Sequence, residues 1–265
     1  MTAWLAFTAL TVGLVLVILI LARLSTSVIN AADSSSTTVT VDETHLDVHG
    51  PPDEEQRNLD GPQGIDFSTK ELVANVTLSH GLFTVILGLG IYITDIPLPA
   101  LGIAPDPMST GWIALWIGIA VGILLSFANT IAGGLTRIFR EDPSEHLREL
   151  LAPESTSGWI ILIGLVLPII AIFEELLFRA ALIGALAAGF DISPWILAIV
   201  SSGAFAVGHQ TQGHLGIIVT GLLGFALAIV FILTNSLLAV IIAHYIVNAT
   251  EFIVIEGIGW EPFTK

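Results

Sequence analysis

The stretch that decides the fold runs from residue 158 to residue 188 and reads GWIILIGLVLPIIAIFEELLFRAALIGALAA. It is long enough to cross a bilayer as a helix, which requires about 20 mostly apolar residues. Three charged residues, Glu174, Glu175 and Arg179, nevertheless lie inside it. A charge at the bilayer centre costs roughly 2.5 to 3.5 kcal/mol even on a lenient scale, so such residues usually face the protein interior and serve a function.

The rest of the chain has the composition of a multi-pass membrane protein. Of its 265 residues, 54% are hydrophobic and only 12% are charged, and the mean hydropathy is +0.89. These values exclude an ordinary soluble domain. Apolar runs of spanning length occur at residues 3–22, 72–94, 111–134, 158–188, 194–212, 215–233 and 236–256. The sequence therefore predicts an all-α transmembrane bundle of about seven spans, with the lipid bilayer as its surroundings.

Composition divides the chain into three parts. Residues 1–24 predict an N-terminal transmembrane anchor, and residues 71–260 predict the membrane helical core. Between them, residues 25–70 are rich in Ser, Thr, Pro, Gly and acidic residues, which predicts an acidic, largely disordered linker. Between the third and fourth spans, Asp142, Pro143 and Glu145 form a capping pattern that predicts a short helix.

The charged residues outside the spans indicate the orientation. If seven spans alternate, the basic residues of the loops and ends all fall on one side, which predicts a cytoplasmic C-terminus, an external N-terminus and a place in the cell (plasma) membrane. The formal net charge of −15 argues against a nucleic-acid partner. It is typical either of a halophile-like acidic protein or simply of an acidic linker, and the sequence leaves both interpretations open.

A few further polar residues lie within the later spans. His209 lies in the fifth, and His244 and Asn248 lie four residues apart in the seventh. Glu175 and Arg179 share one helix face and can pair. Glu174 lies about 100° round the helix from Glu175, so it needs a partner on another helix. Counting residues along the spans places Glu174, His209 and Asn248 at similar depth, with His244 about a turn nearer the outside.

This set of side chains suits hydrolysis. A carboxylate can deprotonate water, and imidazole and amide donors can hold the oxyanion of a tetrahedral intermediate. The same residues could equally bind a metal, although the chain lacks the HExxH motif that is the strongest zinc signal. A Glu-Arg pair that only locks helices together, and histidines that only bond between helices, are the structural alternatives. Three other histidines, His80, His146 and His214, are predicted to lie near span ends or in loops without a special role.

Three motifs now stand in order: EELLFR at Glu174 to Arg179, FAVGH at Phe205 to His209, and HYIVN at His244 to Asn248. They match EExxxR, FxxxH and HxxxN. With this signature, residues 158–256 resemble the CAAX prenyl protease and bacteriocin-processing (CPBP, or Abi) family of intramembrane metalloproteases. One departure is Ala180, where many relatives have glycine.

The resemblance implies a role for each matching residue. Glu174 and His209 would activate the attacking water, and His244 and Asn248 would stabilise the oxyanion. Glu175, Arg179 and Phe205 would support the site. The family is named as metalloproteases, and Glu174, His209 and His244, with Asn248 nearby, could hold Zn²⁺ and leave water in an open position.

The sequence thus predicts an intramembrane endopeptidase that hydrolyses a peptide bond of a membrane-associated or CAAX-like protein or peptide. Two other classes remain as alternatives. One is a non-catalytic binding or immunity protein on the same scaffold, and the other is a proton-coupled transporter that uses Glu174 and the histidines as a relay.

Overall fold

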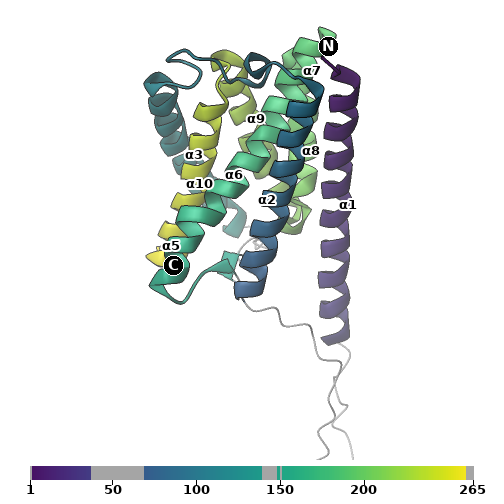
Figure 1. Cartoon of the computed structure of the whole chain (residues 1–265). Coiled ribbons are helices and arrows are strands. Elements are labelled where there is room, and N and C mark those ends of the chain that lie inside the picture. Colours follow the sequence, from purple (N-terminus) through teal and green to yellow (C-terminus); the bar gives the residue numbers. More distant parts are fainter. Residues whose placement is uncertain (1, 37–68, 139–147, 150, 261–265) are drawn as a thin grey trace, which may run out of the picture.

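The computed structural model describes residues 2–36, 69–138, 148–149 and 151–260. Every regular element in these residues is a helix, and the helices form one bundle (Figure 1). Six segments are long and apolar enough to cross a membrane, and a seventh, shorter apolar helix accompanies them. The prediction of an all-α transmembrane bundle of about seven spans is therefore confirmed. Most of the predicted linker and the helix predicted at Asp142 to Glu145 lie outside the described residues.

The first half of the chain supplies three long helices and one short 3₁₀ turn. They are α1 (Trp4–Ser36), α2 (Thr69–Thr94), η1 (Leu98–Leu101) and α3 (Trp112–Ile138). The part of α1 that is long and apolar enough to cross a membrane is Trp4–Leu24, and the helix itself continues to Ser36. It runs along one edge of the bundle, next to α2 (Figure 1).

The fourth span is one helical segment from Thr156 to Phe190 that changes pitch along its length. Its parts are α5 (Thr156–Ile161), the π-helical η2 (Leu162–Val166), α6 (Leu167–Glu175), the π-helical η3 (Leu176–Ala185) and α7 (Leu186–Phe190). The side chain of Ser155 accepts a hydrogen bond from the backbone N–H of Gly158, which caps the start of the segment. Short π-helical turns are uncommon and often lie at functional sites, and η3 begins directly after Glu175.

The last part of the chain forms three antiparallel helices with short connections. The three are α8 (Pro194–Gly208), α9 (Gly213–Thr234) and α10 (Leu237–Glu251). The short η4 (Gln210–Gln212) links α8 to α9, and the π-helical η5 (Phe252–Gly257) follows α10. The predicted end of the fifth span at residue 212 is wrong, because α8 stops at Gly208 and the chain turns through η4 into α9. His209 is consequently the residue that ends α8 rather than one inside it.

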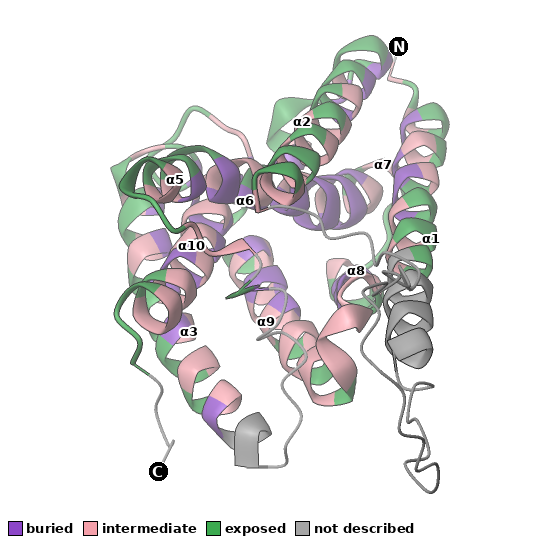
Figure 2. Ribbon diagram, turned by 90° about the horizontal axis from the view of Figure 1, so that it is seen from below, coloured by how far each residue is buried: buried purple, intermediate pink, exposed green. Residues whose placement is uncertain are grey.

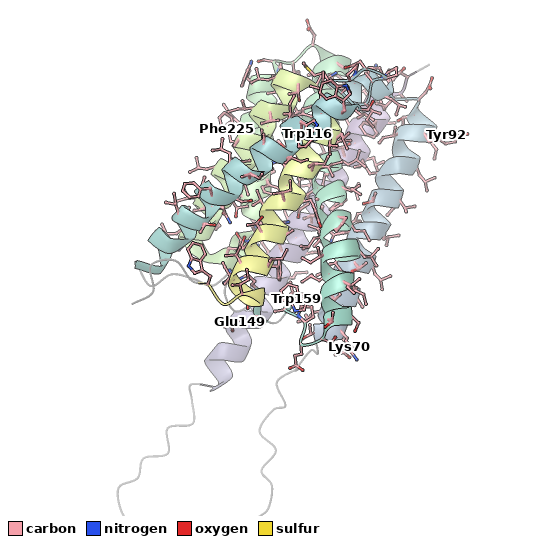
Figure 3. The ribbon with its side chains drawn as sticks, turned by 90° about the vertical axis from the view of Figure 1, so that its left-hand side faces the viewer. Lys70, Tyr92, Trp116, Glu149, Trp159 and Phe225 are labelled. Atoms are coloured by element: carbon pink, nitrogen blue, oxygen red, sulfur yellow. The ribbon has the colours of Figure 1, made fainter. Side chains whose placement is uncertain are left out.

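The bundle is buried at its centre and apolar on its outside. Buried residues gather on the fourth span and on the faces that α9 and α10 turn towards it, while the outer faces of α1 and α2 are exposed (Figure 2). Exposed apolar side chains on those faces are what lipid contact requires. Tyr92 and Trp116 lie towards one end of the bundle, and Trp159 lies with Lys70 at the other (Figure 3).

Close packing between α3 and α10 depends on two glycines one turn apart, Gly118 and Gly122. A Cβ atom added to Gly122 would lie 2.8 Å from Cβ of Ile246 and 3.1 Å from Cα of Ala243. At Gly118 it would lie 2.7 Å from the carbonyl oxygen of Ala239. This is the small-residue spacing that lets membrane helices approach each other closely. Because α10 carries His244, the contact also sets the distance of that histidine from the fourth span.

Gly122→Ala should therefore destabilise the bundle by about 1 to 3 kcal/mol, because the added methyl group overpacks the α3–α10 contact. The measurement is the thermal unfolding midpoint of the full chain in detergent. Gly88→Ala is the control, since nothing lies within 4 Å of a Cβ at that position. The packing argument fails if both variants unfold at the wild-type temperature.

Candidate active site

Glu174 occupies the penultimate position of α6, and its carboxylate is surrounded by imidazole rings. Its side chain is 11% exposed. Nε2 of His244 lies 3.5 Å from Oε2, and Nε2 of His209 lies 3.9 Å from Oε1. The expectation that Glu174 faces histidines of other helices is thus confirmed in geometry, because its place on α6 directs it away from Arg179.

Glu175 is completely buried and accepts two strong hydrogen bonds at one oxygen. Nη1 of Arg179 donates to Oε1 at 2.8 Å, which is the pair expected from the i,i+4 spacing. Nδ1 of His244 donates to the same oxygen at 2.6 Å, a contact that the spacing did not predict. Charge-assisted bonds of this kind are roughly twice as strong as neutral ones. They tie α10 directly to the fourth span.

Arg179 extends this network to a third helix. Its Nη2 donates to the backbone carbonyl of Gly224 on α9 at 2.9 Å. Its guanidinium also lies over the ring of Phe205, 4.8 Å from the centroid, which is cation–π geometry. The helices approach closely at Gly224, where an added Cβ atom would lie 3.0 Å from the ring of Phe205. The arginine therefore joins the fourth span to α9 and to the FxxxH motif on α8.

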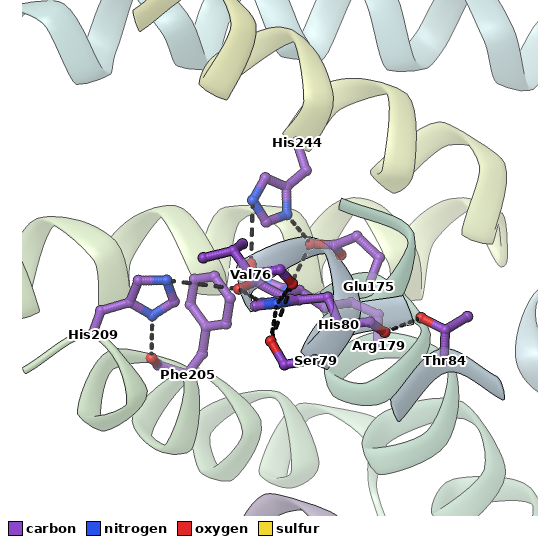
Figure 4. A network of polar contacts seen from close by, with 10 residues as sticks. Val76, Ser79, His80, Thr84, Glu175, Arg179, Phe205, His209 and His244 are labelled. Carbon is purple, nitrogen blue, oxygen red and sulfur yellow. Dashed lines mark hydrogen bonds and ion pairs between the residues drawn. The ribbon is translucent and has the colours of Figure 1, made fainter. Parts of the chain in front are cut away.

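His209 is held by the residue one turn before it. Its Nδ1 donates to the backbone carbonyl of Phe205 at 2.8 Å, and the two rings lie 4.5 Å apart (Figure 4). Because a carbonyl can only accept, this bond assigns the proton of the neutral ring to Nδ1. Nε2 is then left as the nitrogen that faces Glu174. The aromatic residue of FxxxH thus positions the histidine through both its backbone and its ring.

Asn248 lies one turn after His244 on α10, lining the same cavity as Glu174. No hydrogen bond or ion pair between Asn248 and Glu174 occurs among the described residues. The depth estimate is therefore wrong in one respect, since His244 rather than Asn248 is level with the carboxylate. The interlocked hydrogen bonds of Glu175 explain this, because they draw His244 against the fourth span.

The three motifs hence form one cluster across three spans. Residues 156–250 match the family model described as "Type II CAAX prenyl endopeptidase Rce1-like". This range contains every residue of the three motifs. Residues 156–250, called the Rce1-like domain below, are therefore similar to this family, and the match supports a relationship to the CAAX proteases. No curated protein and no solved structure gives a significant match to the chain. The Rce1-like domain points to a protease in general terms.

A cavity of about 260 Å³ lies beside this cluster, between the Rce1-like domain and neighbouring parts of the chain. Glu174, His209, His244 and Asn248 all line it. From them the cavity extends towards the ends of α3 and α10, where Asn129, Arg148 and Glu251 also contribute.

These last residues form a second polar cluster, which also includes Glu256. Glu251 accepts hydrogen bonds of 3.1 Å from both Asn129 and Arg148, and Nε of Arg148 donates to Glu256 at 2.7 Å. The cluster joins α3, α10 and η5 to the chain segment that precedes the Rce1-like domain.

One neighbour of Glu174 was missed in the sequence. Nε2 of His80 lies 3.9 Å from Oε1 of Glu174. His80 was expected near a span end without a special role, and that expectation is wrong because it lies well inside α2. The available signal was an ionisable side chain more than two turns inside an apolar run, the same signal that singled out His209 and His244. His80 lies outside the matched domain.

The residues expected to bind zinc are close together but do not form a ligand set as they stand. No group of three His, Asp or Glu side chains in residues 2–36, 69–138, 148–149 and 151–260 is arranged to hold a metal ion. Glu174, His209 and His244 instead face one another as a carboxylate and its imidazole partners. Such an arrangement is suited to proton transfer between the carboxylate and the rings.

Arg179→Met should destabilise the protein by about 3 to 5 kcal/mol, since it leaves the buried Glu175 without its cation. Thermal unfolding of the full chain in detergent measures the loss, and the exposed Arg23→Met is the matched control. The double variant Arg179→Met, Glu175→Gln should lose less unfolding free energy than the sum of the losses of the two single variants, because it no longer buries an unpaired charge. Strict additivity would contradict the interlocked network.

Proposed function

We propose that the chain is an intramembrane endopeptidase in which Glu174 activates the water that cleaves a peptide bond. The observation that carries this proposal is the position of the Glu174 carboxylate. It lies within 3.5 to 3.9 Å of Nε2 atoms of His209 and His244, at the wall of a cavity inside a CAAX-type protease domain. A carboxylate in such a place is suited to general-base catalysis.

The first step requires a water molecule between the base and the scissile carbonyl. Nε2 of neutral His209 is an acceptor, because its proton is held on Nδ1 by the carbonyl of Phe205. The water can donate one hydrogen bond to His209 and the other to Glu174. As its oxygen forms a bond to the carbonyl carbon, its proton moves to the Glu174 carboxylate.

The tetrahedral intermediate then needs donors for its oxyanion. Asn248 can donate from its side-chain amide, and His244 can donate from Nε2 when its ring is doubly protonated. The Glu175 carboxylate, bonded to Nδ1 of His244 at 2.6 Å, stabilises that protonated ring. Glu174 finally transfers its proton to the leaving nitrogen as the carbon–nitrogen bond breaks. The protons therefore balance: one proton of the water ends on the leaving nitrogen, and the other stays with the water oxygen on the new carboxyl group.

The proposed substrate is the tail of a membrane-associated or CAAX-like protein or peptide. The cavity reaches from Glu174 towards the end of the bundle where Arg148 and Gln212 lie. Lys70 and Glu149 lie at this same end (Figure 3), which supports its assignment as the cytoplasmic end. The proposal therefore places the C-terminus in the cytoplasm, the N-terminus outside, and the enzyme in the plasma membrane.

Glu174→Gln should remove cleavage while leaving expression unchanged, because the amide cannot accept a proton. A loss of about 10² to 10⁴ in rate is typical for a general base. The measurement compares peptide termini in membranes of cells that express the wild type or the variant at equal level. Defined termini should be present only with the wild type. The exposed His214→Gln is the control and should reproduce the wild-type profile.

The comparison of wild type with Glu174→Gln also distinguishes the two alternative functions, a binding or immunity protein and a transporter. Identical termini for wild type and Glu174→Gln, together with an unchanged cellular phenotype, would indicate a binding or immunity protein. Uptake that responds to a proton gradient without any cleaved product would indicate a transporter.

The arrangement of Glu174, His209 and His244 supports a mechanism in which no step depends on zinc. We therefore expect the purified protein to keep its cleavage rate within about twofold after dialysis against a strong chelator. The measurement is the rate on a peptide that spans a cleavage site mapped in the membrane comparison. A rate that is lost on dialysis and restored by Zn²⁺ alone would contradict this expectation.

A further inference from the structure

A third imidazole approaches Glu174 from a helix outside the Rce1-like domain. His80 lies in α2, and its Nε2 is 3.9 Å from Oε1 of Glu174, the same distance and the same oxygen as for His209. The carboxylate therefore has two rings at Oε1, and the ring of His244 at Oε2. Figure 4 shows the three labelled histidines converging on one centre from different helices.

The orientation of the His80 ring is fixed by its own helix. Nδ1 donates to the backbone carbonyl of Val76, four residues earlier, at 2.9 Å. The ring also meets Phe173 edge to face, with 5.2 Å between centroids. Because the carbonyl only accepts, Nδ1 carries the proton and Nε2 is turned to Glu174.

The same arrangement recurs at each of the three histidines. Nδ1 of His80 and of His209 donates to the carbonyl one turn earlier, and Nδ1 of His244 donates to Glu175. In each case Nε2 is the atom presented to Glu174. A histidine held at one nitrogen so that the other faces a reactive group is a recurring device of functional sites.

Packing alone does not account for an imidazole at position 80. Phe83, on the same helix, already packs against Phe173, with 5.7 Å between ring centroids. An apolar side chain at position 80 would complete the α2–α6 contact without bringing a polar atom to a buried carboxylate. Burying such an atom has a cost unless it is matched by a polar partner.

The lining of the cavity distinguishes His80 from the other two histidines that face Glu174. Glu174, His209, His244 and Asn248 line the cavity, whereas His80 is absent from its lining. His80 thus contacts the carboxylate without forming part of the cavity wall. It is placed to act on Glu174 and not on the substrate.

We propose that His80 is a positioning residue that fixes the rotation of the Glu174 carboxylate, so that Oε1 faces the water held by His209. This inference rests on the proposed protease function. A separation of 3.9 Å is too long for a direct hydrogen bond, so the ring acts through its bulk and, when it is doubly protonated, through the attraction of its positive charge for the carboxylate. Misplacing a catalytic group by about 1 Å can reduce a rate about 100-fold, which makes such positioning consequential.

The first test measures the contact without reference to catalysis. The full chain, its His80→Leu and Glu174→Gln variants, and the double variant are purified in detergent and unfolded by heat. The shifts of the two single variants should fail to add in the double variant by at least about 2 °C, because the residues interact. Additive shifts would overturn the proposal, whatever the catalytic result.

The second test measures the role of the ring. On a synthetic peptide spanning the mapped cleavage site, His80→Leu should lower kcat about 10- to 100-fold and leave KM within about twofold. His80→Gln keeps a polar group that can face the carboxylate, so its kcat should stay within about threefold of the wild type. The control His214→Leu should match the wild type.

Two outcomes of the second test overturn the proposal. An unchanged kcat in His80→Leu shows that the ring does not position the base. Equal losses in His80→Leu and His80→Gln, with lower unfolding temperatures in both, show a packing role only. The proposed function fails separately, if Glu174→Gln still cleaves. An inactive Glu174→Gln beside a fully active His80→Leu rejects only the inference about His80.

Discussion

The structure depends on one buried oxygen atom. Oε1 of Glu175 accepts from Arg179 within its own span and from His244 on α10. Arg179 in turn bonds to α9 and lies over Phe205 of α8. A buried carboxylate is costly unless its charge is matched and hydrogen-bonded. Helices that moved apart would leave this charge unmatched, so the network holds the fourth span, α8, α9 and α10 in one relative arrangement.

This network also separates the tasks of two adjacent glutamates. Glu175 is committed to structure, because its accepting oxygen is already bonded to an arginine and a histidine. In the part of the chain that the structure describes, the close charged or ionisable partners of Glu174 are imidazole nitrogens at 3.5 to 3.9 Å, and Arg179 bonds to Glu175 instead. Its carboxylate lines the cavity, which is why it and not Glu175 is the proposed base. The division follows from the angle of about 100° between successive helix residues.

Much of the fold and the site could be predicted from the sequence, because the governing signals are local. Apolar length gives the spans, and i,i+4 spacing gives the Glu175–Arg179 pair. The level of His244 could not be predicted, because it depends on a hydrogen bond between distant spans and on glycine packing against α3. The role of His80 was missed for a related reason, since only the tertiary fold brings α2 against α6.

The shortness of α8 has a consequence for the surrounding lipid. Its 15 residues give a rise of about 22 Å, against a hydrocarbon thickness of about 30 Å. The polar turn that follows, with Gln210 and Gln212, then falls at a depth where lipid tails would otherwise lie. Such a mismatch is relieved by local thinning of the bilayer. Thinning of the bilayer beside His209 would shorten the path that water must travel to reach the cavity at Glu174.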